Sequence, residues 1–373
     1  MKTSLLIAAE KPNERLLKIA YALKSKGVSV AGVFNKIANS VELGRYFDFL
    51  RFEPDTNELA AVVQRFPCDL VHLHSYSYDK TCLDILLKTT KKIIYDPKDV
   101  YAGILDADGL NHPRGAVDGQ IHLLTKSAGL VLRDGQAHLS ARLGKYKLAS
   151  KRILFPDFCW PVDFYPKQVR HFDAMNFNSL RLVFIGNFWP ETQPPHWTGA
   201  GQIFNFKTLL DKGHSIDVYP TSYMAVWDFS EYHDLASAYP GRFRFMPHCL
   251  EYELVVKKLP QYDAGIFFPQ EGFIERPTTY WHASLHRYGV GARIFDFISA
   301  GLLTIVSFQQ RSKHRFVHAG LAVKLDQEPL GVALDKLSYK FREAIYGEDR
   351  LKLMKKISID AYTDRLLNFY RKV

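Results

Sequence analysis

The sequence predicts an α/β protein built from two doubly wound domains and a helical C-terminal segment. The chain has 373 residues, and domains usually hold about 100–200 residues, so two domains are expected. Short apolar runs typical of buried parallel strands alternate with helical patterns in both halves of the chain. A stretch rich in proline and aromatic residues, without a clear period, separates the two series. Strands that alternate strictly with helices form a parallel sheet with helices on both faces.

The first domain begins with an apolar strand at residues 4–9 and a helix that starts near Asn13. The apolar residues of this helix recur at helical spacing, and Gly27 suits the left-handed cap at its end. A strand at residues 28–34 completes one strand–helix–strand unit, the crossover that parallel strands need. The pattern then repeats, with further strands expected at residues 69–74, 92–95, 129–132 and 152–155, and further helices at residues 59–66, 79–89, 121–127 and 136–143.

Prolines at positions 156, 161 and 166 interrupt this alternation. Proline has no amide hydrogen and fixes its own backbone angle, so it usually ends a helix or strand rather than continuing it. We therefore place the first domain at residues 1–165, an interdomain linker at 166–178 and the second domain at 179–345. The second domain is expected to have strands at residues 180–185, 215–219, 243–246, 264–268 and 303–307, and helices at residues 203–212, 252–259 and 292–300. A helical segment at 346–373 is expected to pack back toward the first domain.

Composition favours an anionic partner and gives no sign of a metal-binding or disulfide framework. The 49 Lys and Arg residues exceed the 39 Asp and Glu residues, a formal net charge of +10. Such an excess suits an anionic membrane surface or a phosphorylated substrate, although an inert basic surface fits equally well. The positive charges form no block, so we expect no nucleic-acid partner. The four cysteines lie far apart without a C-x-x-C pair, and we expect reduced thiols.

The N-terminal apolar run is too short for a signal peptide, and no apolar stretch reaches the roughly 20 residues of a membrane helix. We therefore expect a cytoplasmic protein with at most peripheral contact with the inner face of the membrane.

Residues 291–306 have the most specific pattern: a loop, a helix that Gly301 ends, and a buried strand. Arg293 and Asp296 are three residues apart and lie on one face of this helix. The start of a helix suits phosphates, and Arg293 adds a permanent charge and a planar set of donors. Asp296 suits two adjacent ribose hydroxyls. The alternative, which the pattern alone favours, is an ordinary surface ion pair worth under about 1 kcal/mol.

This segment resembles the donor-site segment of retaining GT-B glycosyltransferases, those of the group 1 or family 4-like type. The positions that match the family pattern are Arg293, Phe295, Asp296, Phe297, Ser299, Ala300, Gly301, Ile305 and Val306. Segments near residues 11–27, 69–74, 127–132, 153–166 and 182–187 resemble other parts of the family in the same order. The resemblance implies two Rossmann-like domains that face each other across a cleft, the first binding the acceptor and the second binding a nucleotide sugar.

Further donor-binding candidates lie around the first strand of the second domain. Residues 182–187 resemble the first strand of the family's nucleotide domain, so Gly186 and Asn187 are candidates. Thr198 suits a helix cap, and the glycines that follow it let a phosphate approach the backbone. Lys207 lies two turns into the next helix, within reach of a phosphate. The alternatives are a plain capped turn and a solvated lysine.

His74 and Asp96 are the catalytic candidates in the first domain. We expect His72 and His74 to face opposite sides of their strand, which disfavours a metal site and leaves one of them for the ligand. His74 lies nearer the carboxyl end, outside which ligands bind in parallel sheets. Asp96 follows the next strand, where acceptor binding or acid–base chemistry is expected. The alternatives are a hydrogen-bonded structural histidine and solvated loop charges.

The resemblance implies transfer of a hexosyl or related sugar from a nucleotide diphosphate sugar to a glycan or lipid-linked acceptor, as in polysaccharide biosynthesis. It also implies retention of the anomeric configuration and no metal or other cofactor. Two alternatives remain open. One is a GT-B-like protein that binds a nucleotide or glycan without transfer, and the other is a sugar-nucleotide epimerase or hydrolase.

Overall fold

The computed structural model describes residues 4–36, 42–75, 80–98, 100, 114–133, 144, 146–161, 163–165, 176, 178–187, 202–222, 228–246, 252–267, 292–306, 322–324 and 348–373. The chain divides into two compact units, each with its own parallel sheet. The first unit combines Met1–Asp157 with Ile359–Val373, and the second spans Phe158–Ser358. The chain therefore leaves the first unit once and returns to it with its last helix.

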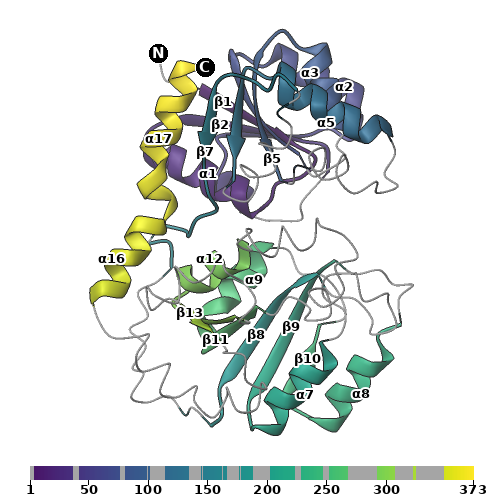
Figure 1. The fold of residues 1–373 in the computed structure, drawn as a ribbon, viewed down its shortest axis with the longest axis vertical. Helices are drawn as coiled ribbons and strands as arrows, with labels where there is room; N and C mark the ends of the chain where they lie inside the picture. The colour runs from purple at the N-terminus through teal and green to yellow at the C-terminus, as the bar shows by residue number, and fades with distance from the viewer. Residues whose placement is uncertain are drawn as a thin grey trace. The chain divides into compact units, whose positions relative to one another are not determined.

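The first unit contains a seven-stranded sheet with the order β3-β2-β1-β4-β5-β6-β7 (Figure 1). Its strands are β1 (Ser4–Ala9), β2 (Ser29–Phe34), β3 (Phe49–Phe52), β4 (Leu70–Ser75), β5 (Lys92–Pro97), β6 (Gly129–Leu132) and β7 (Arg152–Leu154). The central strands are almost continuous runs of buried residues, as in a sheet covered on both faces. The strand order reverses between β1 and β4, which makes this pair the switch point of the sheet.

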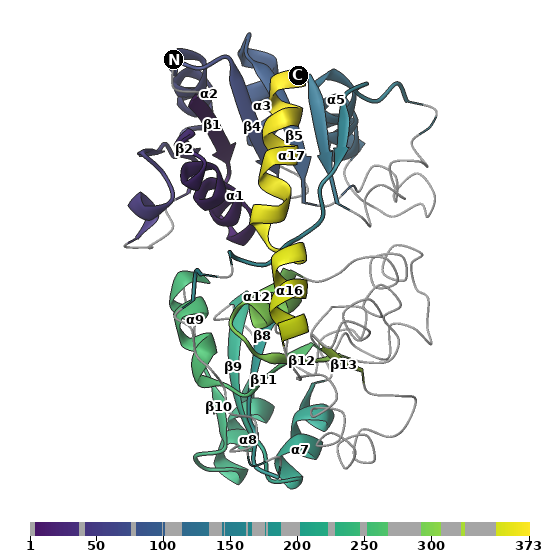
Figure 2. The same ribbon diagram turned by 90° about the vertical axis from the view of Figure 1, so that its left-hand side faces the viewer.

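Five of the helices that the structure describes cover the first sheet. They are α1 (Glu14–Ser25), α2 (Thr56–Arg65), α3 (Lys80–Lys88), α5 (Arg114–Lys126) and α17 (Ile359–Lys372). Figures 1 and 2 show α1 and α17 on one face of the sheet, and α2, α3 and α5 on the other. Side chains cap the start of two of these helices. The Asn13 side chain accepts hydrogen bonds from the first backbone amides of α1, and the Asp55 side chain does so for α2.

The second unit contains a six-stranded sheet with the order β10-β9-β8-β11-β12-β13. Its strands are β8 (Arg181–Asn187), β9 (Ser215–Ser222), β10 (Phe243–Phe245), β11 (Ala264–Phe267), β12 (Leu303–Val306) and β13 (Ala322–Lys324), and its helices are α7 (Ile203–Asp211), α8 (Ser230–Ala238), α9 (Tyr252–Lys258), α12 (Ala292–Ser299) and α16 (Glu348–Ile357). One apolar core joins the sheet to α7 and α8, and another joins it to α9 and α12. Here the switch point lies between β8 and β11.

The predicted fold class is confirmed: both sheets are parallel, doubly wound and followed by C-terminal helices. The strands and helices expected within the described ranges are present, and α5 starts seven residues earlier than expected. The sequence reading missed β3, α8 and β13. Two of these are edge strands, and the N-cap residue of α8 is Phe229, whose side chain cannot cap the helix. The helix expected at 136–143 lies outside the described residues.

The predicted domain boundaries stay a prediction, because most of residues 166–178 and all of residues 325–347 lie outside the described ranges. Among the helices that the structure describes, none combines the length and apolar character needed to cross a membrane.

Candidate functional site

The start of α1 brings a buried arginine to the switch point of the first sheet. The Asn13 side chain accepts hydrogen bonds from the amides of Arg15 and Leu16, at 3.1 and 3.2 Å, and so fixes the first turn of the helix. The start of α1 lies outside the carboxyl end of β1, because the helix follows that strand directly. The Arg15 side chain is only 2% exposed.

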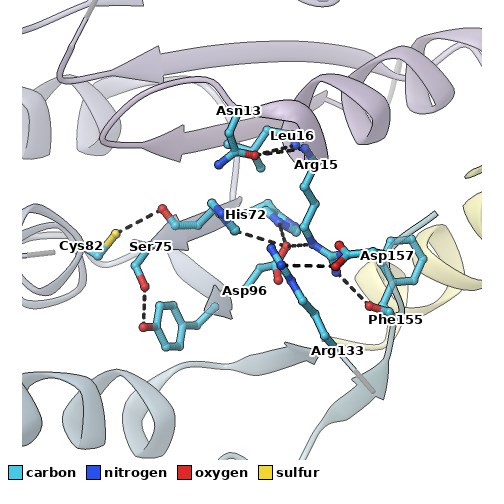
Figure 3. A network of polar contacts seen from close by, with 12 residues as sticks. Asn13, Arg15, Leu16, His72, Ser75, Cys82, Asp96, Arg133, Phe155 and Asp157 are labelled. Atoms are coloured by element: carbon cyan, nitrogen blue, oxygen red, sulfur yellow. Dashed lines mark hydrogen bonds and ion pairs between the residues drawn. The ribbon is translucent and has the colours of Figure 1, made fainter. Parts of the chain in front are cut away.

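Arg15 joins three segments of the first unit (Figure 3). Its Nε donates to Asp96 Oδ2 on β5 at 2.8 Å, and its Nη1 donates to Asp157 Oδ1 at 2.9 Å. The same guanidinium donates to the carbonyl oxygens of Phe155, at 2.9 Å, and Pro156, at 3.1 Å. Arg133 also contacts Asp157, at 3.3 Å. The guanidinium of Arg15 therefore fixes the segment after β7, where the first unit ends.

Asp96 lies inside β5 and is fully buried, so it is not a solvated loop charge. Its Oδ2 lies 3.2 Å from His72 Nε2 and 3.5 Å from His74 Nδ1. The expectation that His72 and His74 face opposite sides of the strand is wrong. Side chains alternate along a strand with a period of two, so residues i and i+2 share a face. The register pairs His74 with Asp96 across β4 and β5, which places all three side chains on that face.

Two pKa shifts define the charge state of this cluster. Burial raises the pKa of Asp96, but the Arg15 charge, the hydrogen bond from His72 and the nearby His74 ring outweigh it and hold the pKa well below its usual value. Burial lowers the pKa of His74, against the opposing effect of Asp96. At neutral pH Asp96 is therefore a carboxylate and His74 is a neutral imidazole. Neither ring nitrogen of His74 has a hydrogen-bond partner, and the Oδ1 of Asp96 has none.

His72 connects this cluster to α17. Its Nδ1 lies 2.8 Å from the Tyr370 hydroxyl. Burial raises the pKa of Tyr370 well above its ordinary value, and the Asp96 charge raises it further, so the side chain remains a phenol. A carboxylate can only accept, so His72 Nε2 donates to Asp96, while Nδ1 forms a hydrogen bond with the Tyr370 hydroxyl. This is a hydrogen-bonded structural histidine, the alternative that the sequence left open.

The second unit places its candidates along the carboxyl edge of β8 and β11. Gly186 and Asn187 end β8, where the pairing with β9 shifts register between these two residues. Helix α7 follows β8 and α12 follows β11, and the two helices pack on opposite faces of the sheet. A helix that follows a parallel strand starts on the carboxyl side of the sheet, so the N-termini of α7 and α12 lie on that side.

Arg293 and Asp296 lie in the first half of α12. Arg293 Nη1 donates to Asp296 Oδ2 at 3.3 Å. The Asp296 side chain is 1% exposed and that of Arg293 is 17% exposed. The pair is therefore not an ordinary surface pair, because its acidic member is buried. The structure brings Arg293 and Asp296 together as the helical spacing predicts.

The structure does not bring Lys207 toward this pair. Lys207 donates to Asp211 Oδ2 at 2.8 Å on the next turn of α7, and to the hydroxyl of Tyr239 at the end of α8. Hydrogen bonds to these two side chains raise the pKa of Lys207 to about 12. Thr198 lies outside the described residues. Among the residues that the structure describes, no group of three or more His, Cys, Asp or Glu residues is arranged to hold a metal ion.

The sequence reading missed Arg15, Asp157 and Tyr370. A signal was present for Arg15, which is four residues before Ile19 and eight before Leu23, within the apolar face of its own helix. A charge within an apolar stripe predicts a buried ion pair. Asp157 and Tyr370 carried no local signal, because their partners are far away in the chain.

Comparisons with known proteins show the fold. No protein-family model and no curated protein matches the sequence. HepE from Anabaena, solved in complex with UDP-glucose, superposes with a TM-score of 0.67 at 9% identity, over 99% of this chain and 100% of that one. Sucrose-phosphate synthase from Thermosynechococcus elongatus gives 0.63 at 11% identity, over 100% and 99%. A trehalose-6-phosphate synthase studied with bisubstrate glycomimetics gives 0.61 at 12% identity, over 99% of each chain. The chain therefore has the GT-B fold, with two Rossmann-like domains.

Proposed function

We propose that this protein is a glycosyltransferase that moves a hexosyl or related sugar from a nucleotide diphosphate sugar to a glycan or lipid-linked acceptor. The reaction is proposed to retain the anomeric configuration and to need no metal ion. The observation that carries the proposal is the carboxyl edge of the second sheet, where Arg293 lies in the first turn of α12 beside the switch point.

Electrostatics at this edge suit a departing nucleotide diphosphate. Helix N-termini present backbone amides and a positive dipole end to an anion. The Arg293 guanidinium adds a permanent positive charge that Asp296 holds in place. Fixed positive groups of this kind stabilise charge that develops on a leaving group. A carboxylate offers about four acceptor positions, so Asp296 is proposed to accept from ribose hydroxyls while it holds Arg293.

The first unit is proposed to bind the acceptor outside β4 and β5. His74 is a neutral imidazole beside the Asp96 carboxylate, and its ring nitrogens have no hydrogen-bond partner. An imidazole whose Nδ1 faces a carboxylate presents Nε2 as an acceptor for a hydroxyl proton. Asp96 cannot serve as an acid at neutral pH, because Arg15 holds it ionised. We assign proton acceptance to His74 and its orientation to Asp96.

The structural neighbours support a nucleotide-sugar substrate. HepE was solved with UDP-glucose, and the trehalose-6-phosphate synthase was studied for glycosyl transfer with retention. The formal charge of +10 suits peripheral contact with an anionic membrane face, where a lipid-linked acceptor is proposed to lie.

A panel of nucleotide sugars tests the proposal. The purified chain is incubated with UDP-glucose, GDP-mannose and ADP-glucose, with melting temperature and nucleotide release as readouts. We expect a raised melting temperature with one donor, and nucleotide release that depends on an added acceptor. Stabilisation without release under any condition indicates a binding protein, release without acceptor a hydrolase, and interconversion of sugars an epimerase.

Variants of the α12 pair test the site. Arg293→Met should weaken donor binding roughly 10- to 100-fold, because a hydrogen bond to a charged group contributes about 1.5–3 kcal/mol. The double variant Arg293→Met/Asp296→Asn removes both charges, so it should recover stability but not binding. Arg181→Met is the matched control, since Arg181 forms an exposed ion pair with Asp263 in the same unit. Unchanged donor affinity in Arg293→Met would exclude this assignment.

A further inference from the structure

A set of exposed basic side chains lies along the amino ends of three strands of the first sheet. The strands are β5, β6 and β7, which are parallel neighbours, so their amino ends share one edge of the sheet. Helix α5 leads into β6 and therefore ends at this edge. Helix α17 also ends there, since Lys92 and Lys151 both donate to Val373 O, at 3.1 and 3.2 Å (Figure 2). We call this set the basic edge, and its members are Lys92, Lys126, Lys147, Lys151, Arg152, Arg371 and Lys372.

Backbone contacts hold the members of the basic edge close together. Arg152 is the first residue of β7, and Lys126 lies in the last turn of α5. The Ala149 amide donates to the Leu124 carbonyl at 3.0 Å, which joins the segment before β7 to the end of α5. The basic edge is therefore one surface, formed by two helix ends, two strand starts and the loop that precedes β7.

The positive charges of the basic edge are not balanced by acidic side chains of the described chain. Every member is exposed, and no described acidic side chain forms an ion pair with any of them. Asp48 and Asp69 precede strands on the same side of the sheet, but Asp48 pairs with Lys24, at 3.0 Å. A helix C-terminus supplies only about half a negative charge, so α5 and α17 together neutralise a small part of the set. The basic edge is therefore suited to an external anion.

An exposed apolar side chain on the same side of the first unit favours a lipid surface as that anion. Helix α3 leads into β5 and packs against α5, so both helices end on the side of the basic edge. Leu87, in the last turn of α3, is 60% exposed. Anionic headgroups attract Lys and Arg, and the adjoining acyl region accepts an apolar side chain. A polynucleotide would use the charges but offers little to an exposed leucine.

We propose that the basic edge binds the anionic face of a lipid bilayer. The proposal identifies the surface that makes the peripheral contact of the proposed function. His74 and Asp96 lie in the carboxyl halves of β4 and β5, and a strand of this length spans about 20 Å. A bilayer at the amino ends of the strands therefore leaves the proposed acceptor site uncovered. A lipid-linked acceptor would have to carry its reacting end beyond the headgroup layer to reach this site.

The test is flotation of the full chain with two kinds of vesicle. One kind contains phosphatidylglycerol and phosphatidylcholine, and the other contains phosphatidylcholine alone. We expect the wild type to bind only the first kind and to be released at high salt, because salt screens exposed charges. The triple variant Lys126→Gln/Lys147→Gln/Arg152→Gln should bind roughly 100-fold more weakly, since each basic residue near an anionic surface contributes roughly fivefold. None of these three side chains forms a hydrogen bond within the described structure, so the melting temperature should stay unchanged.

Lys212→Gln/Lys257→Gln/Lys258→Gln is the matched control, because it removes the same charge from exposed helix ends of the second unit. It should leave vesicle binding unchanged. The proposal is overturned if the wild type binds neither vesicle or both equally, or if the two triple variants lose the same affinity. It is also overturned if the wild type binds a single-stranded RNA instead of vesicles and only the basic-edge variant releases it, which would assign the surface to nucleic acid. No nucleotide sugar is used, so these outcomes are independent of whether the chain transfers a sugar.

Discussion

Arg15 carries a full charge in the interior of the first unit, although arginine is seldom buried. Two carboxylates and two carbonyl oxygens compensate it, and they come from β5 and from the segment after β7. Moving any ion out of water costs free energy. A buried ion is therefore stable only while all of its charged and polar partners are present. Replacing any one of these residues should therefore lower the free energy of unfolding by a measurable amount.

Arg15→Met should lower the free energy of unfolding by about 3–5 kcal/mol, the usual cost of leaving a buried charge without its partner. Methionine keeps the unbranched apolar stem of the side chain and removes the guanidinium, which leaves the Asp96 carboxylate buried without its counter-charge. Urea denaturation measures it. Arg65→Met is the control, because Arg65 is exposed and its guanidinium lies 3.9 Å from the Glu58 carboxylate. This variant should change the free energy of unfolding by less than about 1 kcal/mol. A loss for Arg15→Met no larger than this control would contradict the prediction.

His74 predicts a dependence of stability on pH. Burial lowers the pKa of His74 in the folded chain below its ordinary value of 6.5. The unfolded chain therefore takes up a proton first as the pH falls, so the stability that neutral His74 contributes is present above pH 6.5 and decreases below it. His74→Gln should make melting temperature fall less between pH 7 and pH 5.

His214 in the second unit has a lowered pKa for the same reason, so the wild-type dependence will not vanish completely in His74→Gln. A His214→Gln variant gives the size of that second contribution. An identical pH dependence in wild type and His74→Gln would show that His74 is protonated equally in the folded and unfolded chains.

At the scale of elements, glycines decide where helices dock. Gly129 lies on β6 beneath α17, and a Cβ atom there would lie 2.9 Å from Phe369 Cζ and 3.0 Å from Val373 Cγ2. Lys92 and Lys151 both donate to the O atom of Val373, directly after the same helix, where its dipole is negative. The helix is thus held by close packing and by charge at one end, and Tyr370 reaches His72 as a result.

Gly129→Ala should lower the free energy of unfolding by about 1–3 kcal/mol, because the new methyl group overpacks the contact with Phe369. The double variant Gly129→Ala/Phe369→Leu should lose less than the sum of the two single variants, since both changes act on one contact. Gly44→Ala is the control, as a Cβ there meets no atom within 4 Å. Strict additivity in this cycle, measured by urea denaturation, would contradict the packing described.

Gly265 determines in the same way how closely α12 packs on its sheet. A Cβ atom on Gly265 would lie 2.3 Å from the ring of Phe297, one residue after Asp296 on α12. Helix α12 therefore lies so close to β11 that only a glycine fits between them. The position of Arg293 depends on this contact, which links a strand glycine to the candidate binding site.

At the scale of the molecule, the chain is two compact units, and each has its own parallel sheet. The first unit is discontinuous in sequence, since Ile359–Val373 returns to it after the whole of the second unit. The cores that carry stability are therefore separate, and a local change should act on one of them.

Two unfolding transitions should follow from this organisation in urea or in calorimetry. Arg15→Met should move only the transition of the first unit, and Gly265→Ala should move only that of the second. Fluorescence and circular dichroism should report the transitions at the same denaturant concentrations in each variant. A single transition that both variants shift equally would show instead that the two units unfold as one cooperative body.

The sequence by itself determined the number of domains, the position of most strands and helices, and the pairing of Arg293 with Asp296. These features depend on local periodicity and on spacing within one helix, which a reading along the chain detects. Only the tertiary structure decided that Arg15, Asp96, His72, Asp157 and Tyr370 form one cluster. The His72–Tyr370 contact joins residues 298 positions apart. Buried charges must be neutralised by whatever the fold brings near them, and local sequence does not encode which segments those are.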